Sequence, residues 1–270
     1  MEIHLANLTW PDIEEIQKKP NAVILPVGSV EQHGPHLPLS VDYRCPAYVA
    51  ELAASKVNRE NDIRVLVAPP LQYGTIASTF GGFPGCIGVS PDTAVKVFED
   101  IARGFINSYF TNIIFLNGHF TNVVPLFMAL QKVSLEFPGV GLYGIRWLHL
   151  GSDIIPNIRK SEWGLHADEL ETSATLFIQP ENVHMEKAIK DFPGFSLSER
   201  WVRMDICGDK SKVFFHSRER FPSKAKGSSG VMGDPTVASK ETGEKILNAS
   251  ADDLARIIVE IVASENTAGK

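Results

Sequence analysis

Acidic and imidazole side chains are spaced in this chain so that they could hold a metal ion. Glu31 and His33 are two residues apart, and alternate side chains of an extended segment point to the same side. Asp42 follows at the end of a loop that Pro35 and Pro38 stiffen. Carboxylate oxygen combined with imidazole nitrogen suits zinc, manganese or iron, whereas calcium prefers oxygen alone. The three residues therefore indicate a metal site, although an E-x-H pattern alone also fits a polar loop.

A second histidine and the chemistry of Asp42 extend this site. His119 follows the apolar run IIFL through an Asn-Gly turn. A hydrogen-bonded structural histidine also fits that position. The two oxygens of the Asp42 carboxylate could bridge two ions about 3.5–4 Å apart, as in two-metal hydrolases.

The segment Ala167 to Ile178 reads as a helix with one apolar face. Helical residues advance by about 100°, which places Glu171 on the flank of the buried face and points Glu169 well away from it. Glu171 is therefore the predicted metal ligand, whereas Asp168 and Glu169 complement the helix dipole. His166, at or just before the helix start, could face the same cavity and shuttle a proton.

The elements that must position these residues alternate along the chain. Predicted buried strands are Ala22 to Val27, Arg64 to Ala68, Asn112 to Leu116 and Gly141 to Leu148. Predicted helices are Pro46 to Asn58, Pro91 to Tyr109, Val124 to Phe137, Ala167 to Ile178 and Thr242 to about Ala263. This order predicts an α/β fold in which a mostly parallel sheet is covered on both faces. Three polar loops follow three strands and should converge at the carboxyl edge of the sheet.

Length and composition set limits on the class of protein. The 270 residues, 44% hydrophobic and 21% charged, fit one domain spanning residues 1–270, with irregular structure at about 181–237. A net charge of −6 argues against nucleic-acid binding. We expect a cytoplasmic protein without membrane contact, because no apolar run approaches the roughly 20 residues of a membrane helix and the N-terminus does not look like a secretory signal. The three cysteines are widely spaced and fit reduced thiols.

Four segments together resemble the motifs of the creatininase (creatinine amidohydrolase) family. They are VGSVEQHGPHLPLSVD, FPGCIGVS, NGHFTN and HADELETS, in the family's usual order and with similar spacing. The resemblance implies a three-layer α/β/α fold and a metal pair bridged by Asp42, with Glu31, His33 and His119 as further ligands. It also implies Glu171 as a ligand or near-ligand and His166 as a proton donor.

One position departs from that pattern. Creatininase has a ligand glutamate two residues after the NGH histidine, where this chain has Thr121. Threonine is a poor metal ligand. Creatinine is therefore not the expected substrate, and Glu171 is expected to supply the missing carboxylate unless the second ion is weakly held.

The expected activity is metal-dependent hydrolysis of a C–N bond in a small cyclic amide or related polar metabolite. Hydroxide generated at the metal would attack the carbonyl, His166 would protonate the leaving group, and Glu171 could orient the water. We expect zinc, with manganese or iron as alternatives, and one or two ions per chain. Loop residues placed near the substrate are Tyr73, Thr75, Ser78 and Trp163, although ordinary packing roles fit them as well.

Three alternatives stay open at this point. The enzyme could open the carbon ring of a cyclic polyol ketone of the inosose type, or the chain could be a noncatalytic metal-binding member of the family. A cysteine hydrolase would instead depend on Cys45. The resemblance also implies a homo-oligomer, possibly a hexamer, to which residues 181–237 could contribute contacts.

Overall fold

The computed structural model describes residues 1–76, 82–192, 205–208, 212 and 227–268 of the 270-residue chain. Its strands are β1 (Asn21–Val27), β2 (Arg64–Val67), β3 (Asn112–Asn117) and β4 (Gly141–Arg146). Its α-helices are α1 (Trp10–Ile16), α2 (Val41–Glu60), α3 (Pro91–Asn107), α4 (Val123–Glu136), α5 (Ile155–Ile158), α6 (Glu169–Ile178) and α7 (Lys240–Ala268). Short 3-10 helices lie at Leu5–Asn7, Phe120–Asn122, Trp147–His149, Pro180–Asn182, Met185–Lys187 and Pro235–Val237.

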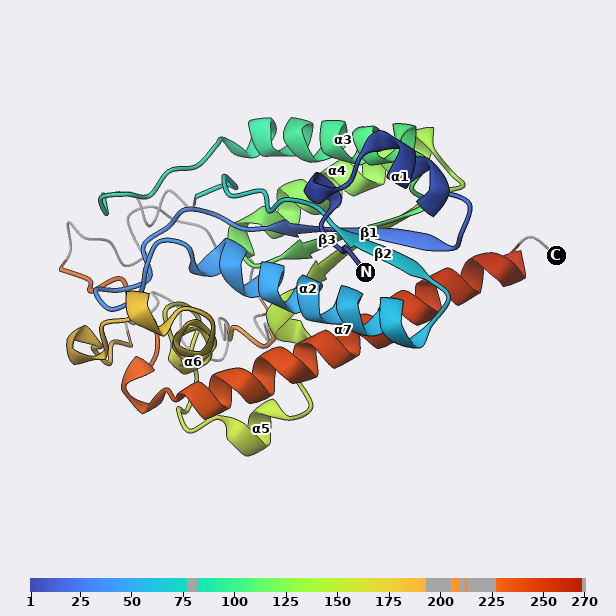
Figure 1. Ribbon diagram of the computed structural model, residues 1–270. Helices are drawn as coiled ribbons and strands as arrows, with labels where there is room; N and C mark the ends of the chain where they lie inside the picture. Colours follow the sequence, from blue (N-terminus) through green and yellow to red (C-terminus); the bar gives the residue numbers. More distant parts are fainter. Residues whose placement is uncertain (77–81, 193–204, 209–211, 213–226, 269–270) are drawn as a thin grey trace.

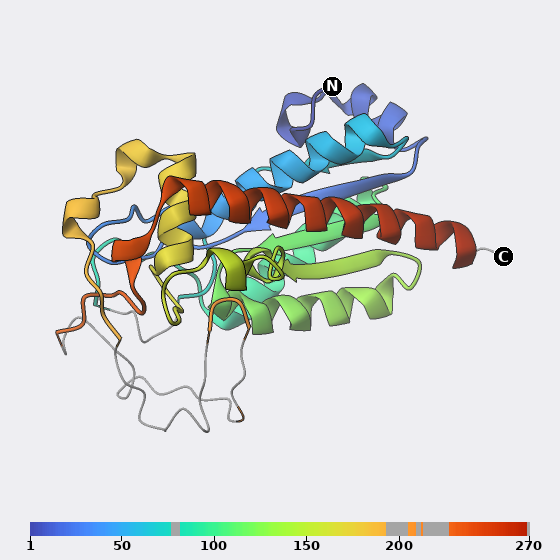
Figure 2. The ribbon, with the colours of Figure 1, turned by 90° about the horizontal axis from the view of Figure 1, so that it is seen from below.

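The four strands form one parallel sheet in the order β2-β1-β3-β4, covered by helices on both faces (Figure 1). Alternate residues of β1 belong to two different apolar clusters, as the pleat of a strand requires. Ala22 and Ile24 pack with α2, α6 and α7 on one face, and Val23 and Leu25 pack with α1, α3 and α4 on the other. Figure 2 shows α7 running beside α2 across the first face. The predicted α/β/α fold is confirmed.

The predicted elements agree with the structure apart from their ends. All four strands are present, but β4 ends at Arg146 and continues as a 3-10 helix, so the predicted end at Leu148 was wrong. The helix predicted from Ala167 begins at Glu169 because the Asp168 side chain accepts hydrogen bonds from the backbone N–H groups of Leu170 and Glu171. The short helices α1 and α5 were not predicted.

Helix α2 begins at Val41, five residues before the predicted start at Pro46. A proline inside a helix lacks the N–H that would bond to the carbonyl four residues earlier, which here is that of Asp42. That carbonyl lies against Gly118, where an added Cβ would be only 1.9 Å away from it. The missing bond therefore allows the end of β3 to approach the first turn of α2.

The described part of residues 181–237 fits the expectation of irregular structure. It contains short 3-10 helices and isolated bridges, such as those of Asp191 with Gly233 and of His166 with Met232. Within the described residues, no helix combines the length and apolarity needed to span a bilayer. The single-domain organisation and the oligomer stay predictions.

Candidate metal centre

Six buried acidic and histidine side chains lie in two adjoining groups beyond the carboxyl ends of β1 and β3. One group consists of Glu31, Asp42 and His119, and the other of His33, His166 and Glu171. In each group, one ligand atom from every residue lies within 4.8 Å of the others. The predicted convergence holds for the loops after β1 and β3, and every residue predicted to bind metal lies in one of the two groups.

The first group gathers around His119. Its Nδ1 lies 2.9 Å from Asp42 Oδ2 and 3.1 Å from Glu31 Oε2. The His119 backbone is held by Asn117, whose Oδ1 accepts from the His119 N–H and whose Nδ2 donates to the His119 carbonyl. The Asn-Gly turn seen in the sequence therefore fixes the ring against the two carboxylates.

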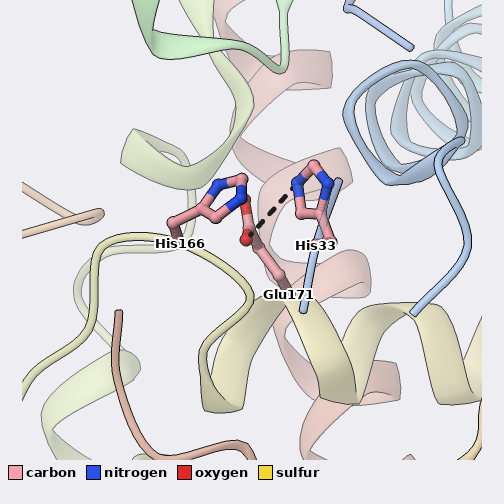
Figure 3. Close-up of side chains that lie close together, drawn as sticks. All are labelled: His33, His166 and Glu171. Carbon is pink, nitrogen blue, oxygen red and sulfur yellow. Dashed lines mark ion pairs between the residues drawn. The ribbon is translucent and has the colours of Figure 1, made fainter. Parts of the chain in front are cut away.

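The second group gathers around Glu171, whose side chain extends from α6 toward two imidazole rings (Figure 3). Glu171 Oε2 lies 3.8 Å from His33 Nε2 and also accepts a hydrogen bond from the Ala167 N–H. The rings of His33 and His166 pack against each other with their centres 4.2 Å apart. Two nitrogens and a carboxylate oxygen thus face one small volume.

Asp42 joins the two groups. Its Oδ1 lies 3.1 Å from His33 Nε2 in the second group, and its Oδ2 contacts His119 in the first. Ser29, which sequence reasoning missed, donates to Asp42 Oδ2 at 2.7 Å and orients the carboxylate. The spacing of Glu31 and His33 had suggested one common centre. The structure instead assigns the two residues to different groups, because residues 31–33 do not form a regular strand.

Two glycines allow Asp42 to reach this position. A Cβ on Gly28, directly after β1, would lie 2.4 Å from the Asp42 backbone, and one on Gly118 would collide with the same peptide. Any larger residue at either position would push the first turn of α2 away from the sheet. The ends of β1 and β3 therefore hold the first turn of α2 in place.

Helix α6 separates the roles of its three acidic residues. Glu171 faces His33, as helical phase predicts. Asp168 caps the helix. Glu169 points away from both groups but is fully buried, and its carboxylate accepts hydrogen bonds from the backbone N–H groups of Lys160 and Ser161. Glu169 therefore anchors the segment of Lys160 and Ser161, and the predicted role of complementing the helix dipole does not explain its burial.

The buried charges shift the pKa values of these groups. Burial is the main effect that raises the pKa of Glu31 and of Glu171, the latter to about 8. Burial opposes protonation of His33, but the charges of Asp42 and Glu171 outweigh it and raise its pKa to about 10. Burial also opposes protonation of His119, whose pKa the charges of Glu31 and Asp42 raise to about 9. Protons on these histidines and a divalent cation would therefore compete for the same carboxylates.

The residues present fit a divalent transition metal. Each group combines imidazole nitrogen with carboxylate oxygen, the ligand set of zinc, manganese and iron. Glu31 Oε1 is buried and has no hydrogen-bond partner among the described residues. An unpartnered buried carboxylate oxygen is costly unless a cation faces it.

The residues predicted to lie near the substrate have different surroundings. Tyr73 is half exposed, and Trp163 packs against Phe192. Thr75 is buried and hydrogen-bonds to Thr121 and Asn122. Ser78 lies outside the described residues. Their contact with a substrate stays a prediction.

Another residue that sequence reasoning missed is Gln32, between Glu31 and His33. Its backbone carbonyl lies 2.7 Å from His166 Nε2, and its side-chain amide lies 3.1 Å from the same nitrogen. The E-Q-H order alone gave no sign of this contact, because His166 is 134 residues away along the chain.

Comparisons with known proteins agree with the fold. Residues 6–258 match the family described as creatininase, creatinine amidohydrolase. The 3-dehydro-scyllo-inosose hydrolase of Thermotoga maritima is 28% identical over 96% of this chain and 84% of its own length. The mycofactocin precursor peptide peptidase of Mycolicibacterium smegmatis is 29% identical over 87% of this chain and 84% of its own. A solved zinc–zinc form of a creatininase variant superposes with a TM-score of 0.77 at 23% identity, covering 97% of this chain and 99% of that one.

Proposed function

The chain belongs to the creatininase family, because the family match extends over residues 6–258, and we propose that it is a metal-dependent hydrolase with two metal positions that share Asp42. The observation that carries the proposal is the placement of this carboxylate. One of its oxygens faces His33 and the other faces His119. A carboxylate placed in this way can serve two ions at once.

The ligand groups divide the two positions. Glu31 and His119 would hold one ion, and His33 and Glu171 the other, with Asp42 common to both. Bound divalent cations would polarise the carbonyl of a substrate and lower the pKa of water toward neutrality. Zinc is the proposed metal, with support from the zinc–zinc form of a creatininase variant; manganese and iron are the alternatives.

His166 is the proposed carrier of the proton. Burial, together with the charge of His33, lowers the pKa of His166 well below its ordinary value, so the ring is neutral near pH 7. Its Nε2 lies 2.7 Å from the Gln32 backbone carbonyl and 3.1 Å from the Gln32 side-chain amide, so Gln32 holds the ring in place. The ring would accept the proton of the attacking water and then pass it to the leaving nitrogen or carbon, while the water oxygen joins the carbonyl carbon.

The proposed substrate is a small polar metabolite with a hydrolysable C–N bond, such as a cyclic amide other than creatinine. The similarity to a peptide peptidase supports cleavage next to a carbonyl at nitrogen. The similarity to 3-dehydro-scyllo-inosose hydrolase over 96% of the chain favours a second candidate, ring opening of a cyclic polyol ketone. Both reactions add water to a carbonyl carbon, and they differ in the atom that leaves.

A hydrolysis screen with metal analysis tests the proposal. The protein is stripped of metal, reloaded with Zn²⁺ or Mn²⁺, and assayed with cyclic amides, formamides, short peptides and cyclic polyol ketones, with creatinine as a comparison. We expect metal-dependent turnover in one of the first four classes and little with creatinine. Two bound ions without turnover on any of them would favour a noncatalytic metal-binding protein.

A further inference from the structure

The two ring nitrogens of His119 face opposite surroundings. Nδ1 faces Asp42 Oδ2 at 2.9 Å and Glu31 Oε2 at 3.1 Å. Nε2, on the other side of the ring, lies 2.6 Å from Thr121 Oγ1. Any ion held by Glu31 and Asp42 must therefore bind Nδ1, and the Thr121 oxygen is directed to the opposite side of the ring.

The position of the Thr121 proton follows from its contact with the backbone carbonyl of Thr75, since the Thr75 hydroxyl donates to Thr121 Oγ1 at 3.0 Å and takes no proton from it. Thr121 Oγ1 lies 2.8 Å from the backbone carbonyl of Thr75. A carbonyl oxygen only accepts, and a hydroxyl has a single proton to donate. If Thr121 donated that proton to His119, the Thr75 carbonyl would lose this donor in a residue that is only 3% exposed. Thr121 therefore donates to Thr75 and accepts from His119, which places a proton on His119 Nε2.

The carbonyl that accepts from Thr121 is itself held in place. Asn122 Oδ1 accepts from the Thr75 N–H at 2.8 Å, and Asn122 Nδ2 donates to the Gly28 carbonyl at 3.1 Å. Gly74 permits this contact, because a Cβ there would lie 2.4 Å from Asn122 Oδ1. The loop that carries Thr75 is thus tied to the end of β1, which leads directly into the metal-ligand loop.

We propose that Thr121 is a positioning residue that fixes His119 with its proton on Nε2 and its lone pair on Nδ1, directed at the metal position. The inference rests on the proposed function, since it takes Glu31, Asp42 and His119 as ligands. Outer partners of ligating histidines orient the ring, and their loss typically costs about 10–100-fold in metal affinity. Thr121 thus acts on the metal through His119 and not as a ligand.

The test compares zinc affinity, by competition with a chromophoric chelator, among four proteins. Thr121→Val keeps the shape of the side chain but removes the hydroxyl, and is expected to weaken Zn²⁺ binding about 10–100-fold. Thr121→Ser keeps the hydroxyl, so its Zn²⁺ affinity should lie within about threefold of that of the wild type, well short of the loss expected for Thr121→Val. Thr111→Val is the matched control, because it makes the same substitution at an exposed residue before β3, at the end of that strand opposite His119, and it should leave Zn²⁺ affinity unchanged.

A second readout separates positioning from a general loss of structure. In the zinc-loaded protein, ¹H–¹⁵N NMR of the imidazole groups, assigned with His119→Gln, should show His119 protonated on Nε2 and coordinated through Nδ1. In Thr121→Val the Nε2 proton signal should shift and exchange faster with water, whereas Thr121→Ser should retain it.

The two proposals fail in different ways. Unchanged zinc affinity and an unchanged His119 signal in folded Thr121→Val would overturn the positioning role alone, as would coordination through Nε2 in the wild type. A wild-type protein that binds no zinc, manganese or iron would overturn both. If Thr121→Val does not fold, Thr121→Ser decides: the absence of the His119 Nε2 proton signal in that variant would also overturn the positioning role.

Discussion

Replacing Asp42 by asparagine should weaken metal binding at both positions and also lower the stability of the metal-free protein. The carboxylate lies 3.1 Å from His33 Nε2 and 2.9 Å from His119 Nδ1, and its charge is among those that raise the pKa of both histidines. Removing one partner of a buried ion pair costs about 3–5 kcal/mol. Since 1 kcal/mol shifts Tm by about 2–4 °C in a domain near this size, metal-free Asp42→Asn should melt about 6–20 °C lower than the wild type.

Zinc binding gives the second half of this prediction. Asp42 is proposed to contact both ions directly. Asp42→Asn should therefore weaken zinc binding at each position by more than roughly 100-fold, the upper limit for removing an outer-shell partner. Differential scanning calorimetry of the metal-free proteins and zinc content after dialysis measure the two effects. Asp62→Asn is the control: its side chain is 85% exposed beside Lys19, and its stability should change by about 0.5 kcal/mol or less.

The reasoning would be refuted if Asp42→Asn kept two zinc ions and the melting temperature of the wild type. Loss of stability with normal zinc binding would show that Asp42 only neutralises the two histidines. Loss of zinc from only one position would show that the carboxylate belongs to that position alone.

Three further predictions follow from the same contacts. The metal-free protein should lose stability as pH rises from 6.5 to 10, because the folded pKa values of His33 and His119, about 10 and about 9, lie above the ordinary 6.5. The pKa of Glu171, raised from 4.5 to about 8, adds a loss of stability that begins at pH 4.5. Denaturant unfolding at several pH values measures the effect, and a free energy of unfolding that increased with pH would contradict it. Glu171→Gln should weaken zinc binding more than about tenfold, whereas Glu169→Gln should keep both ions and lower Tm; equal zinc contents would count against the assignment. Cys45→Ala should retain hydrolysis that a chelator abolishes, because Cys45 is buried and burial raises the pKa of its thiol; the opposite pattern in activity assays would favour a cysteine nucleophile.

The sequence was most informative where local periodicity decides structure. β1 is buried along its whole length, and its apolar run predicted it directly. The 100° advance of helical residues separated Glu171 from Glu169 before any tertiary contact was known, because the orientation of a side chain on a helix depends only on its position. The order of strands and polar loops also predicted that the metal ligands lie beyond the strand ends, since parallel strands carry their carboxyl ends at one edge of the sheet.

Long-range contacts limited what the sequence could predict. The division of Glu31 and His33 between two groups depends on the irregular path of residues 31–33, and the position of Asp42 depends on close approaches at Gly28 and Gly118. The start of α2 was misplaced because Pro46 lies inside the helix.

The contacts of Thr121 were equally out of reach. They join residues 46 positions apart, from Thr75 to Thr121, through a backbone carbonyl that no residue pattern reveals. The substitution of threonine for the family's glutamate was visible in the sequence, but the contact of its hydroxyl with His119 was not.

Anomalous X-ray diffraction at the zinc and manganese edges, from crystals grown with each metal, tests the central claim most directly. The account predicts two peaks about 3.5–4 Å apart, one contacted by Glu31, Asp42 and His119 and the other by His33, Asp42 and Glu171. Crystals grown with excess zinc or manganese that show no anomalous peak within bonding distance of Asp42 would contradict the claim.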